Sequence, residues 1–279
     1  MALGWVRGRI SERNCFNEVF TFGHYAQRMK GHFPYRQGFT LVEISIVLVI
    51  IGLIVGGILV GRDLMHEAEL RSVISDINQY KTAFNMFREK YNCLPGDCPN
   101  ATDFLGSGTA NGNGNGIWDS PVDNDEQRYV WEHMSLSQLV GGNYSHTEYE
   151  LGKALPASRV ANAGYWAIYD CAAATPCPFW GRVSNEMIFG KSDSTNGPTN
   201  LSFNDGSLSP PDAYRVDSKI DDGNPSSGNM RAANGYDTAL SGVGACTTAG
   251  PGADYNHPQG YAAYNMSSTD VVCRVLSGI

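Results

Sequence analysis

The sequence lacks the short motifs that mark the common hydrolytic and nucleotide-binding sites. It contains no H-E-x-x-H pair, no G-x-S-x-G elbow and no G-x-x-x-x-G-K-S/T loop. Its histidines are dispersed along the chain, at His24, His32, His66, His133, His146 and His257. A Ser–His–Asp set can be chosen by hand from any chain of this size and indicates nothing. We therefore predict that the protein is not an enzyme.

Basic residues are also few. The chain has 20 Lys and Arg against 28 Asp and Glu, which gives a formal net charge of −8. Six of the bases lie in residues 1–38, so the chain from Phe39 onward carries a net charge of −12. Nucleic acid is bound through basic surfaces that contact its phosphates, and we do not expect it as the main ligand.

Charge is almost absent from residues 39–61, a run of 23 residues in which Glu43 is the one charged side chain. A helix of this length spans ~34 Å, enough to cross a hydrocarbon core of ~30 Å. A carboxylate at the centre of a membrane span costs about 2.5–3.5 kcal/mol, so Glu43 should have a specific partner. Lys30 and Arg36 precede the run and favour a cytoplasmic N-terminus, with the C-terminal part exported.

Gly38, Phe39 and an apolar helix with Glu43 at its fifth position resemble the prepilin signature of type IV pilins and type II secretion pseudopilins. The resemblance is specific over residues 36–61 and weak beyond residue 100. It implies that a prepilin peptidase cleaves after Gly38 and methylates Phe39. It also implies that Glu43 meets the N-terminal amine of a neighbouring subunit, each charge offsetting the other's burial. The alternative is an ordinary signal anchor that contains a glutamate.

This reading divides the chain into three segments. Residues 1–38 form a cytoplasmic leader that is removed, residues 39–61 form a transmembrane and filament-core helix, and residues 62–279 form an exported globular domain. A start at Met29 would give a leader of ordinary length, so we interpret residues 1–28 as an error in the gene start.

The pattern of the exported part predicts an α+β fold. Apolar residues recur at three- and four-residue steps from Leu70 to Tyr91, which predicts that the helix continues with one buried face. Further helices are expected over 123–140 and between Ser209 and Gly223, and strands over 165–169, 186–189, 261–266 and 271–276. We expect the long helix to pack on a small antiparallel sheet with long, disulfide-stapled loops.

The cysteines support the stapled loops. Cys15 lies in the leader region, and the six others are Cys93, Cys98, Cys171, Cys177, Cys246 and Cys273. An even set in an exported domain indicates disulfides, and the absence of a C-x-x-C pair or a nearby histidine cluster argues against zinc. The simplest pairing joins 93 with 98, 171 with 177 and 246 with 273, although six cysteines allow many others.

Two polar segments are candidate calcium sites. The first places oxygen ligands at alternate positions, as in the first part of a calcium loop: Asn111, Asn113, Asn115 and Asp119. The glutamate expected at the twelfth position is Val122, and Asn-Gly repeats also form plain turns, so a loop without metal is the alternative.

The second candidate lies at the C-terminus of the helix expected after Ser209. Asp221 and Asp222 stand where the helix dipole disfavours anions by roughly 0.3–1 kcal/mol each. The compensating charge is either Ca²⁺, held also by Asp217 and Asn224, or Arg231. A solvated turn is the third possibility. No cofactor is required by the sequence, and calcium is the one metal that it suggests.

The resemblance predicts a structural subunit of a type IV pilus or a type II secretion pseudopilus. Its partners would be the prepilin peptidase, other pilin or pseudopilin subunits in a homo- or heteropolymer, and an inner-membrane assembly platform. It would cross the inner membrane once, with a periplasmic domain, before joining a periplasmic or extracellular filament. The large exported domain favours an alternative, a minor or tip pilin that acts as an adhesin or binds cargo. A membrane-anchored periplasmic enzyme is a third class.

Overall fold

The structure is a computed structural model that describes residues 38–119, 126–148, 150–170, 184–191, 205–234, 246–248 and 263–279. The chain divides into two compact units, Met1–Leu53 and Ile54–Ile279. The leader before Gly38, the Cys171–Cys177 pair and Val122 lie outside the described residues.

The first unit contains the start of the long helix α1, which runs over Leu41–Tyr91. Every Leu, Ile and Val side chain from Leu41 to Leu53 is exposed to solvent in this structure. A stretch with no polar face and no buried face is not stabilised by packing within its own chain. These side chains therefore need an apolar environment from outside, such as lipid or other helices.

In the second unit, α1 changes to an amphipathic helix, as the sequence predicts. Its buried face carries Leu70, Val73, Ile77, Tyr80, Ala83, Phe84 and Phe87. The helix ends at Tyr91 because Asn92 adopts the left-handed conformation, with φ 54°, and its N–H donates to the carbonyl of Arg88 at 2.9 Å.

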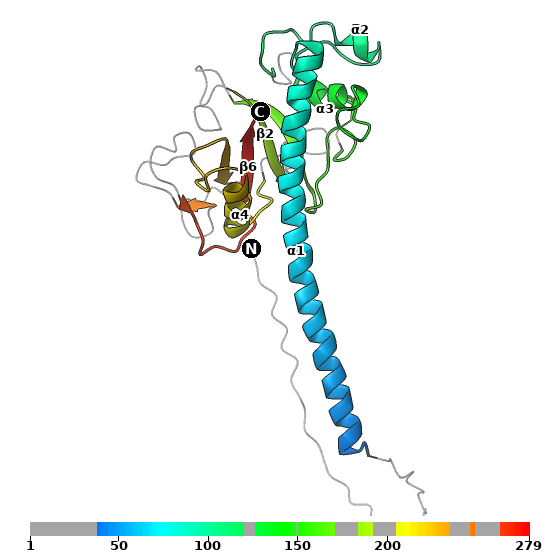
Figure 1. The fold of residues 1–279 in the computed structure, drawn as a ribbon, viewed down its shortest axis with the longest axis vertical. Coiled ribbons are helices and arrows are strands. Elements are labelled where there is room, and N and C mark those ends of the chain that lie inside the picture. The colour runs from blue at the N-terminus through cyan, green and yellow to red at the C-terminus, as the bar shows by residue number, and fades with distance from the viewer. Residues whose placement is uncertain are drawn as a thin grey trace, which may run out of the picture. The chain divides into compact units, whose positions relative to one another are not determined.

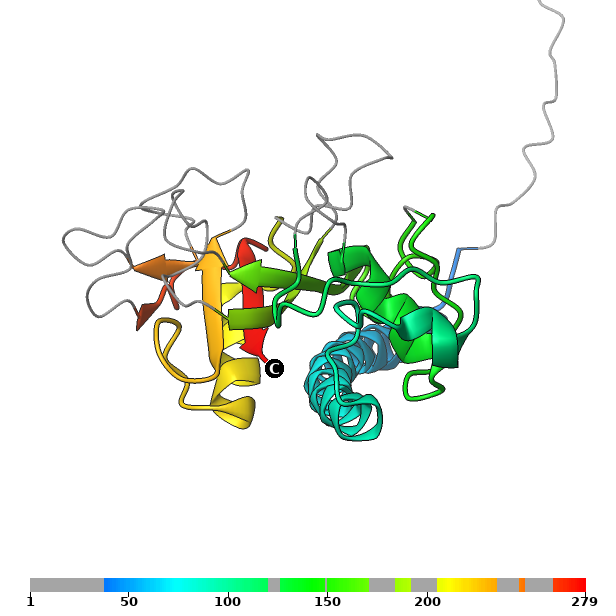
Figure 2. The same cartoon turned by 90° about the horizontal axis from the view of Figure 1, so that it is seen from above.

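The main sheet has four antiparallel strands in the order β1-β2-β6-β3 (Figure 2). The strands are β1 (Ala163–Asp170), β2 (Ser184–Lys191), β3 (Met230–Asn234) and β6 (Cys273–Gly278). The predicted strands over 165–169, 186–189 and 271–276 are confirmed as β1, β2 and β6. Strand β3 was not predicted.

A second, smaller sheet pairs β4 (Thr247–Thr248) with β5 (Ala263–Tyr264). The strand expected over 261–266 corresponds to β5, which in the described residues is only two residues long. Strand β4 was not predicted. Strand β5 ends at Tyr264 because the backbone turns at Met266, whose N–H donates to the carbonyl of Tyr264 at 2.9 Å.

Three shorter helices lie in the described part of the second unit (Figure 1). They are α2 (Ala101–Leu105), α3 (Glu126–Leu136) and α4 (Pro210–Ile220). The cap of α4 is as predicted, because the Ser209 hydroxyl accepts a hydrogen bond from the Asp212 N–H and a proline follows Ser209. Helix α2 was not predicted from the sequence. Helix α3 stops before residue 140, because Gln138 is left-handed, with φ 63°.

Aromatic side chains from three elements meet in the core of the second unit. The ring of Tyr80 on α1 makes edge-to-face contacts with Trp131 on α3 and Tyr165 on β1, each with a centroid distance of 4.9 Å. The Tyr165 hydroxyl donates to Asp76 Oδ2 at 2.9 Å. This cluster attaches α3 and the sheet to the amphipathic part of α1.

Two of the predicted disulfides lie in the described residues. Cys93–Cys98 closes the turn that follows α1, and Cys246–Cys273 joins the residue before β4 to the first residue of β6. Both pairs match the prediction.

Candidate functional site

The first candidate site is the start of α1. Phe39 is 81% exposed, and a Cβ at Gly38 would meet nothing within 4 Å. Packing therefore does not require a glycine at position 38 or a phenylalanine at position 39. A requirement for these residues has to come from a molecule that recognises them.

Glu43 and Thr40 form a capping box at this helix start. The Thr40 hydroxyl accepts a hydrogen bond from the Glu43 N–H at 3.2 Å. The Thr40 N–H and hydroxyl both donate to Glu43 Oε2, each at 2.8 Å. The box satisfies N–H groups that the first turn of a helix leaves without partners. Within the described chain, the Glu43 carboxylate is thus held by neutral groups of its own helix.

Thr40 is a residue that the sequence analysis missed. A threonine three residues before a glutamate, ahead of an apolar run, is the sequence signature of a capping box. The charge of Glu43 in an apolar run predicts a charged partner, and this prediction does not exclude a cap within the same helix.

Helix α1 also meets the length and composition of a membrane span. Among the helices that the structure describes, it alone is long and apolar enough, with a mean hydropathy of 2.9 over its most apolar window. The long apolar N-terminal helix is consistent with a membrane-anchored prepilin. Along the chain this helix is followed by the α+β domain of the second unit.

Comparison with protein families supports this class. Residues 34–59 match the family described as the prokaryotic N-terminal methylation motif. Comparisons with curated proteins and with solved structures found no significant match. The motif is typical of type IV pilins and pseudopilins, which are structural proteins and not enzymes. The chain is thus a pilin-like protein with a prepilin cleavage and methylation motif.

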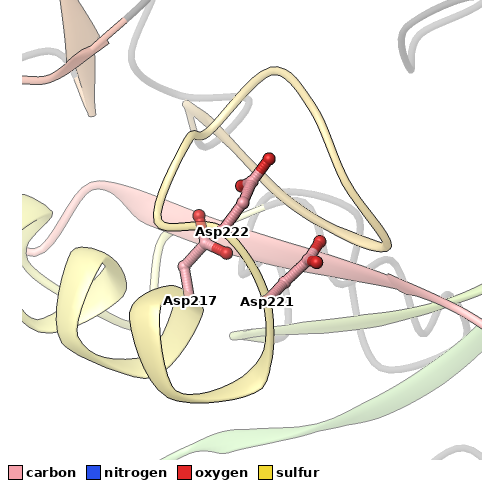
Figure 3. Close-up of side chains that lie close together, drawn as sticks. All are labelled: Asp217, Asp221 and Asp222. Atoms are coloured by element: carbon pink, nitrogen blue, oxygen red, sulfur yellow. The ribbon is translucent and has the colours of Figure 1, made fainter.

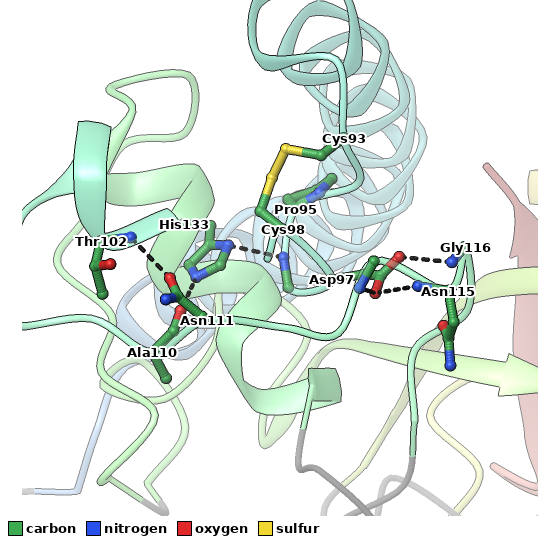
Figure 4. The surroundings of a disulfide bond; sticks show 12 residues. Cys93, Pro95, Asp97, Cys98, Thr102, Ala110, Asn111, Asn115, Gly116 and His133 are labelled. Carbon is green, nitrogen blue, oxygen red and sulfur yellow. Dashed lines mark hydrogen bonds between the residues drawn. A yellow bond between two sulfur atoms is a disulfide. The ribbon is translucent and has the colours of Figure 1, made fainter. Parts of the chain in front are cut away.

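The first calcium candidate forms a network of turns in the structure. The side-chain oxygens of Asn113 and Asn115 accept hydrogen bonds from the N–H groups two residues further on, both at 2.9 Å. Their amide nitrogens donate to Asp119 Oδ2 at 2.6 and 2.9 Å. Asn111 instead accepts from the Thr102 N–H on α2 at 2.9 Å (Figure 4). The structure therefore gathers three of the four predicted ligands and separates Asn111 from them.

Asp97 is the centre of that loop, and the sequence analysis did not identify it. Its buried carboxylate accepts hydrogen bonds from the N–H groups of Gly114, Asn115 and Gly116 at 2.6–3.1 Å (Figure 4). Burial raises the pKa of Asp97, and these three donors oppose that rise. The Asn-Gly repeat thus wraps a protein carboxylate, which gives these residues a structural role in the turn.

The second calcium candidate brings three carboxylates together. Oxygen atoms of Asp217, Asp221 and Asp222 all lie within 4.8 Å of one another (Figure 3). Asp217 is fully buried, and its Oδ2 accepts a hydrogen bond from the Tyr264 hydroxyl at 2.8 Å. Its Oδ1 is buried without a hydrogen-bond partner in the described part of the chain. Burial raises the pKa of Asp217 to about 6, with the charge of Asp222 adding to the rise and the hydrogen bond from the Tyr264 hydroxyl opposing it.

The other two groups predicted for this site lie elsewhere. The Asn224 side-chain oxygen accepts hydrogen bonds from Ser226, whose N–H lies at 3.1 Å, so it is turned to its own loop. Arg231 forms an ion pair with Glu186, and both side chains are buried in the sheet. The proposed salt bridge from Arg231 to Asp221 or Asp222 is therefore wrong, because the guanidinium already neutralises a buried carboxylate.

The remaining cluster has the chemistry of a cation site. Carboxylate oxygens are ligands that Ca²⁺ prefers, and the Asp217 oxygen without a hydrogen bond is the kind of atom that a cation stabilises. Asp217, Asp221 and Asp222 would hold the ion. Calcium here remains a prediction from the residues.

Proposed function

We propose that this protein is a subunit of a type IV pilus or a type II secretion pseudopilus, assembled through its N-terminal helix. The observation that carries the proposal is the methylation motif at residues 34–59, placed on a helix whose apolar side chains are exposed. Such a helix is stable in a bilayer before assembly and in a bundle of like helices after it.

Processing would change the chemistry at Glu43. Cleavage after Gly38 creates an ammonium group on Phe39, which methylation leaves charged. In a filament the Glu43 carboxylate would leave the capping box and accept the amine of a neighbouring subunit. An ion pair in a dry helix bundle offsets the burial penalty of both charges and fixes the axial register between subunits.

The proposed partners and location follow from this scheme. The prepilin peptidase acts on Gly38 and Phe39, and an inner-membrane platform extracts the processed subunit into the polymer. Before assembly the protein crosses the inner membrane once, with its N-terminus in the cytoplasm and the second unit in the periplasm. Residues 1–38 are the leader in this scheme, and residues 62–279 face outward from the filament.

A minor or tip subunit is the second candidate. The second unit extends over Ile54–Ile279 and contains an open pocket lined by aromatic residues, which a purely structural subunit does not need. The amount of the protein in sheared filaments separates the two roles. A major subunit would dominate the preparation, and a tip subunit would be scarce in it.

Mass spectrometry of the N-terminal peptide from the membrane fraction tests the proposal. We expect a peptide that begins with N-methylated Phe39. Gly38→Ala should leave the leader attached while the second unit stays folded, because a Cβ at Gly38 meets nothing in the chain. Gly52→Ala, at an equally open position, is the matched control and should be processed normally. A wild-type chain that keeps its leader in the presence of the peptidase would contradict the proposal.

A further inference from the structure

The second unit contains a pocket that filament assembly through α1 does not use. Its volume is about 490 Å³, and its lining is Tyr214, Gly223, Asn224, Pro225, Ala263, Tyr264 and Met266. This is the size range of pockets that bind small molecules or short peptide segments. The walls come from α4, the loop after it and the segment around β5, which are distant in sequence.

The walls of this pocket are aromatic and apolar. The rings of Tyr214 and Tyr264 meet edge-to-face with a centroid distance of 5.8 Å. Tyr214 and Met266 are 42% and 55% exposed, although both carry large apolar surfaces. Exposed aromatic and methionine side chains around a hollow are typical of binding surfaces, because contact with a ligand removes them from water.

Negative charge lies directly behind these walls. The hydroxyl of Tyr264 donates to the buried carboxylate of Asp217, whose other oxygen has no hydrogen-bond partner in the described residues. The exposed Asp222 accepts a hydrogen bond from the N–H of Asn224, a lining residue, at 2.8 Å. Asp221 completes the cluster shown in Figure 3.

Arg215 and Arg231 do not neutralise this cluster, because each is paired with another carboxylate. Arg215 on α4 pairs with Glu67 at 2.8 Å, and Arg231 on β3 pairs with Glu186. On α1, Lys81 lies near Asp221, whose charge raises the pKa of Lys81 against the larger lowering effect of burial, so Lys81 offsets part of the charge of Asp221. The three carboxylates outnumber the two lysines nearby, Lys81 and the exposed Lys219 in the last turn of α4, so the charge beside the pocket is net negative and favours a cationic occupant.

We propose that this pocket binds a short segment of a partner protein through a lysine side chain. The four-carbon stem would lie against the tyrosines and Met266, and the ammonium group would reach Asp222 in the field of Asp217. Aromatic walls attract a cation through their ring faces, and long basic side chains bury their stems while their charge stays hydrated or paired. The site belongs to the second unit and does not depend on filament assembly.

The test uses the full-length protein in detergent micelles and a fluorescein-labelled Gly-Lys-Lys-Gly amide, followed by fluorescence anisotropy. The comparison peptide has both lysines Nε-acetylated, which preserves the stem and removes the charge. We expect acetylation to weaken binding by at least about tenfold, from the lost ion pair and cation–π contacts.

Variants locate the binding. Tyr214→Ala and Asp222→Asn should each weaken binding by about three- to fivefold, whereas Tyr214→Phe, which keeps the ring, should bind as the wild type does. Asp103→Asn removes one exposed acid from α2 and is the charge-matched control. Met266→Ser changes an exposed side chain and shows the contribution of the wall without disturbing the core.

Three results would overturn the proposal. Equal binding of the two peptides would show that the charge is not recognised. Equal loss in Asp222→Asn and Asp103→Asn would reduce the effect to the net charge of the protein. Binding of Ca²⁺ that depends on Asp217 and Asp222, without binding of either peptide, would assign the acidic cluster to a metal.

Discussion

The two units of this chain differ in which side chains they expose and which they bury. In the first unit, the apolar side chains from Leu41 to Leu53 are exposed and the one carboxylate is held by Thr40. In the second, aromatic rings are buried and charged groups such as Arg231 and Glu186 are paired inside the protein. The first unit is therefore completed by other molecules, and the second by its own long-range contacts. Mutations in the first unit should therefore affect assembly, and mutations in the core of the second unit should affect its stability.

The largest expected effect is the loss of filaments in Glu43→Gln. Glutamine at this position also fits a capping box, so the start of α1 should be preserved while the charge is removed. If Glu43 pairs with the amine of a neighbour, the variant should be processed and inserted normally but should not assemble. Filament yield after shearing, together with the mass of the N-terminal peptide, measures both properties.

Thr40→Ala is the matched variant for that experiment. It removes the capping hydroxyl, at a cost of about 0.5–2 kcal/mol to the helix start, and keeps the carboxylate of Glu43. We expect a smaller loss of filaments than in Glu43→Gln. Normal assembly of Glu43→Gln with failure of Thr40→Ala would mean that Glu43 acts as a cap and not as a charged partner.

In the second unit, the largest expected effect is on stability. Trp131→Ala removes a fully buried ring that contacts Tyr80 and Phe84, and it should lower the free energy of unfolding by about 3–5 kcal/mol. Processing after Gly38 should not change, because the proposed peptidase site belongs to the first unit. Denaturant unfolding of the full-length protein in detergent measures the loss.

Leu136→Ala is the control for the core. Leu136 is on the same helix, α3, but is 41% exposed, so its truncation should cost no more than about 0.5 kcal/mol. A similar loss in the two variants would show that α3 contributes little through Trp131. Loss of processing in Trp131→Ala would show that processing in the first unit depends on the fold of the second.

The same division explains what the sequence could predict. Gly38, Phe39 and Glu43 belong to a linear sequence motif, so a local pattern is sufficient to find them. The residues that belong to each calcium candidate were less predictable. The Asn111 side chain accepts a hydrogen bond from α2, and Arg231 pairs with Glu186 on another strand, and the local sequence shows neither contact.

The missed elements have the same physical origin. Strand β3 has the sequence Met-Arg-Ala-Ala-Asn, which shows no strand pattern, and its position is fixed by pairing with β6. The aromatic and β-branched residues of β1 and β2 gave a local signal, and their ends were displaced by only a few residues. His133 gave no signal at all, because its two partners precede it by more than twenty residues.

His133 provides the most subtle test of the second unit. Its Nδ1 accepts a hydrogen bond from the Gly96 N–H and its Nε2–H donates to the Ala110 carbonyl, both at 2.9 Å (Figure 4). This arrangement requires a neutral ring, and burial lowers the pKa of His133 to about 4. In the unfolded chain the pKa returns to about 6.5.

Between these two values the unfolded chain binds more protons than the folded one, so the contribution of His133 to stability is lost as the pH falls from 6.5 to 4. The loss should reach at most about 3 kcal/mol. Asp217 acts in the opposite direction, since its raised pKa of about 6 favours the folded state as the pH falls toward 4.

The quantity to measure is therefore the difference in the free energy of unfolding between wild type and His133→Gln, by denaturant unfolding at pH 7 and pH 4.5. The contribution of Asp217 is common to both proteins and cancels in this difference. Glutamine keeps a donor and an acceptor but does not titrate, so the wild type should lose its stability advantage over the variant at pH 4.5. An advantage that is equal at the two pH values would mean that the pKa of His133 is not lowered in the folded protein, so that a neutral ring does not bridge Gly96 and Ala110.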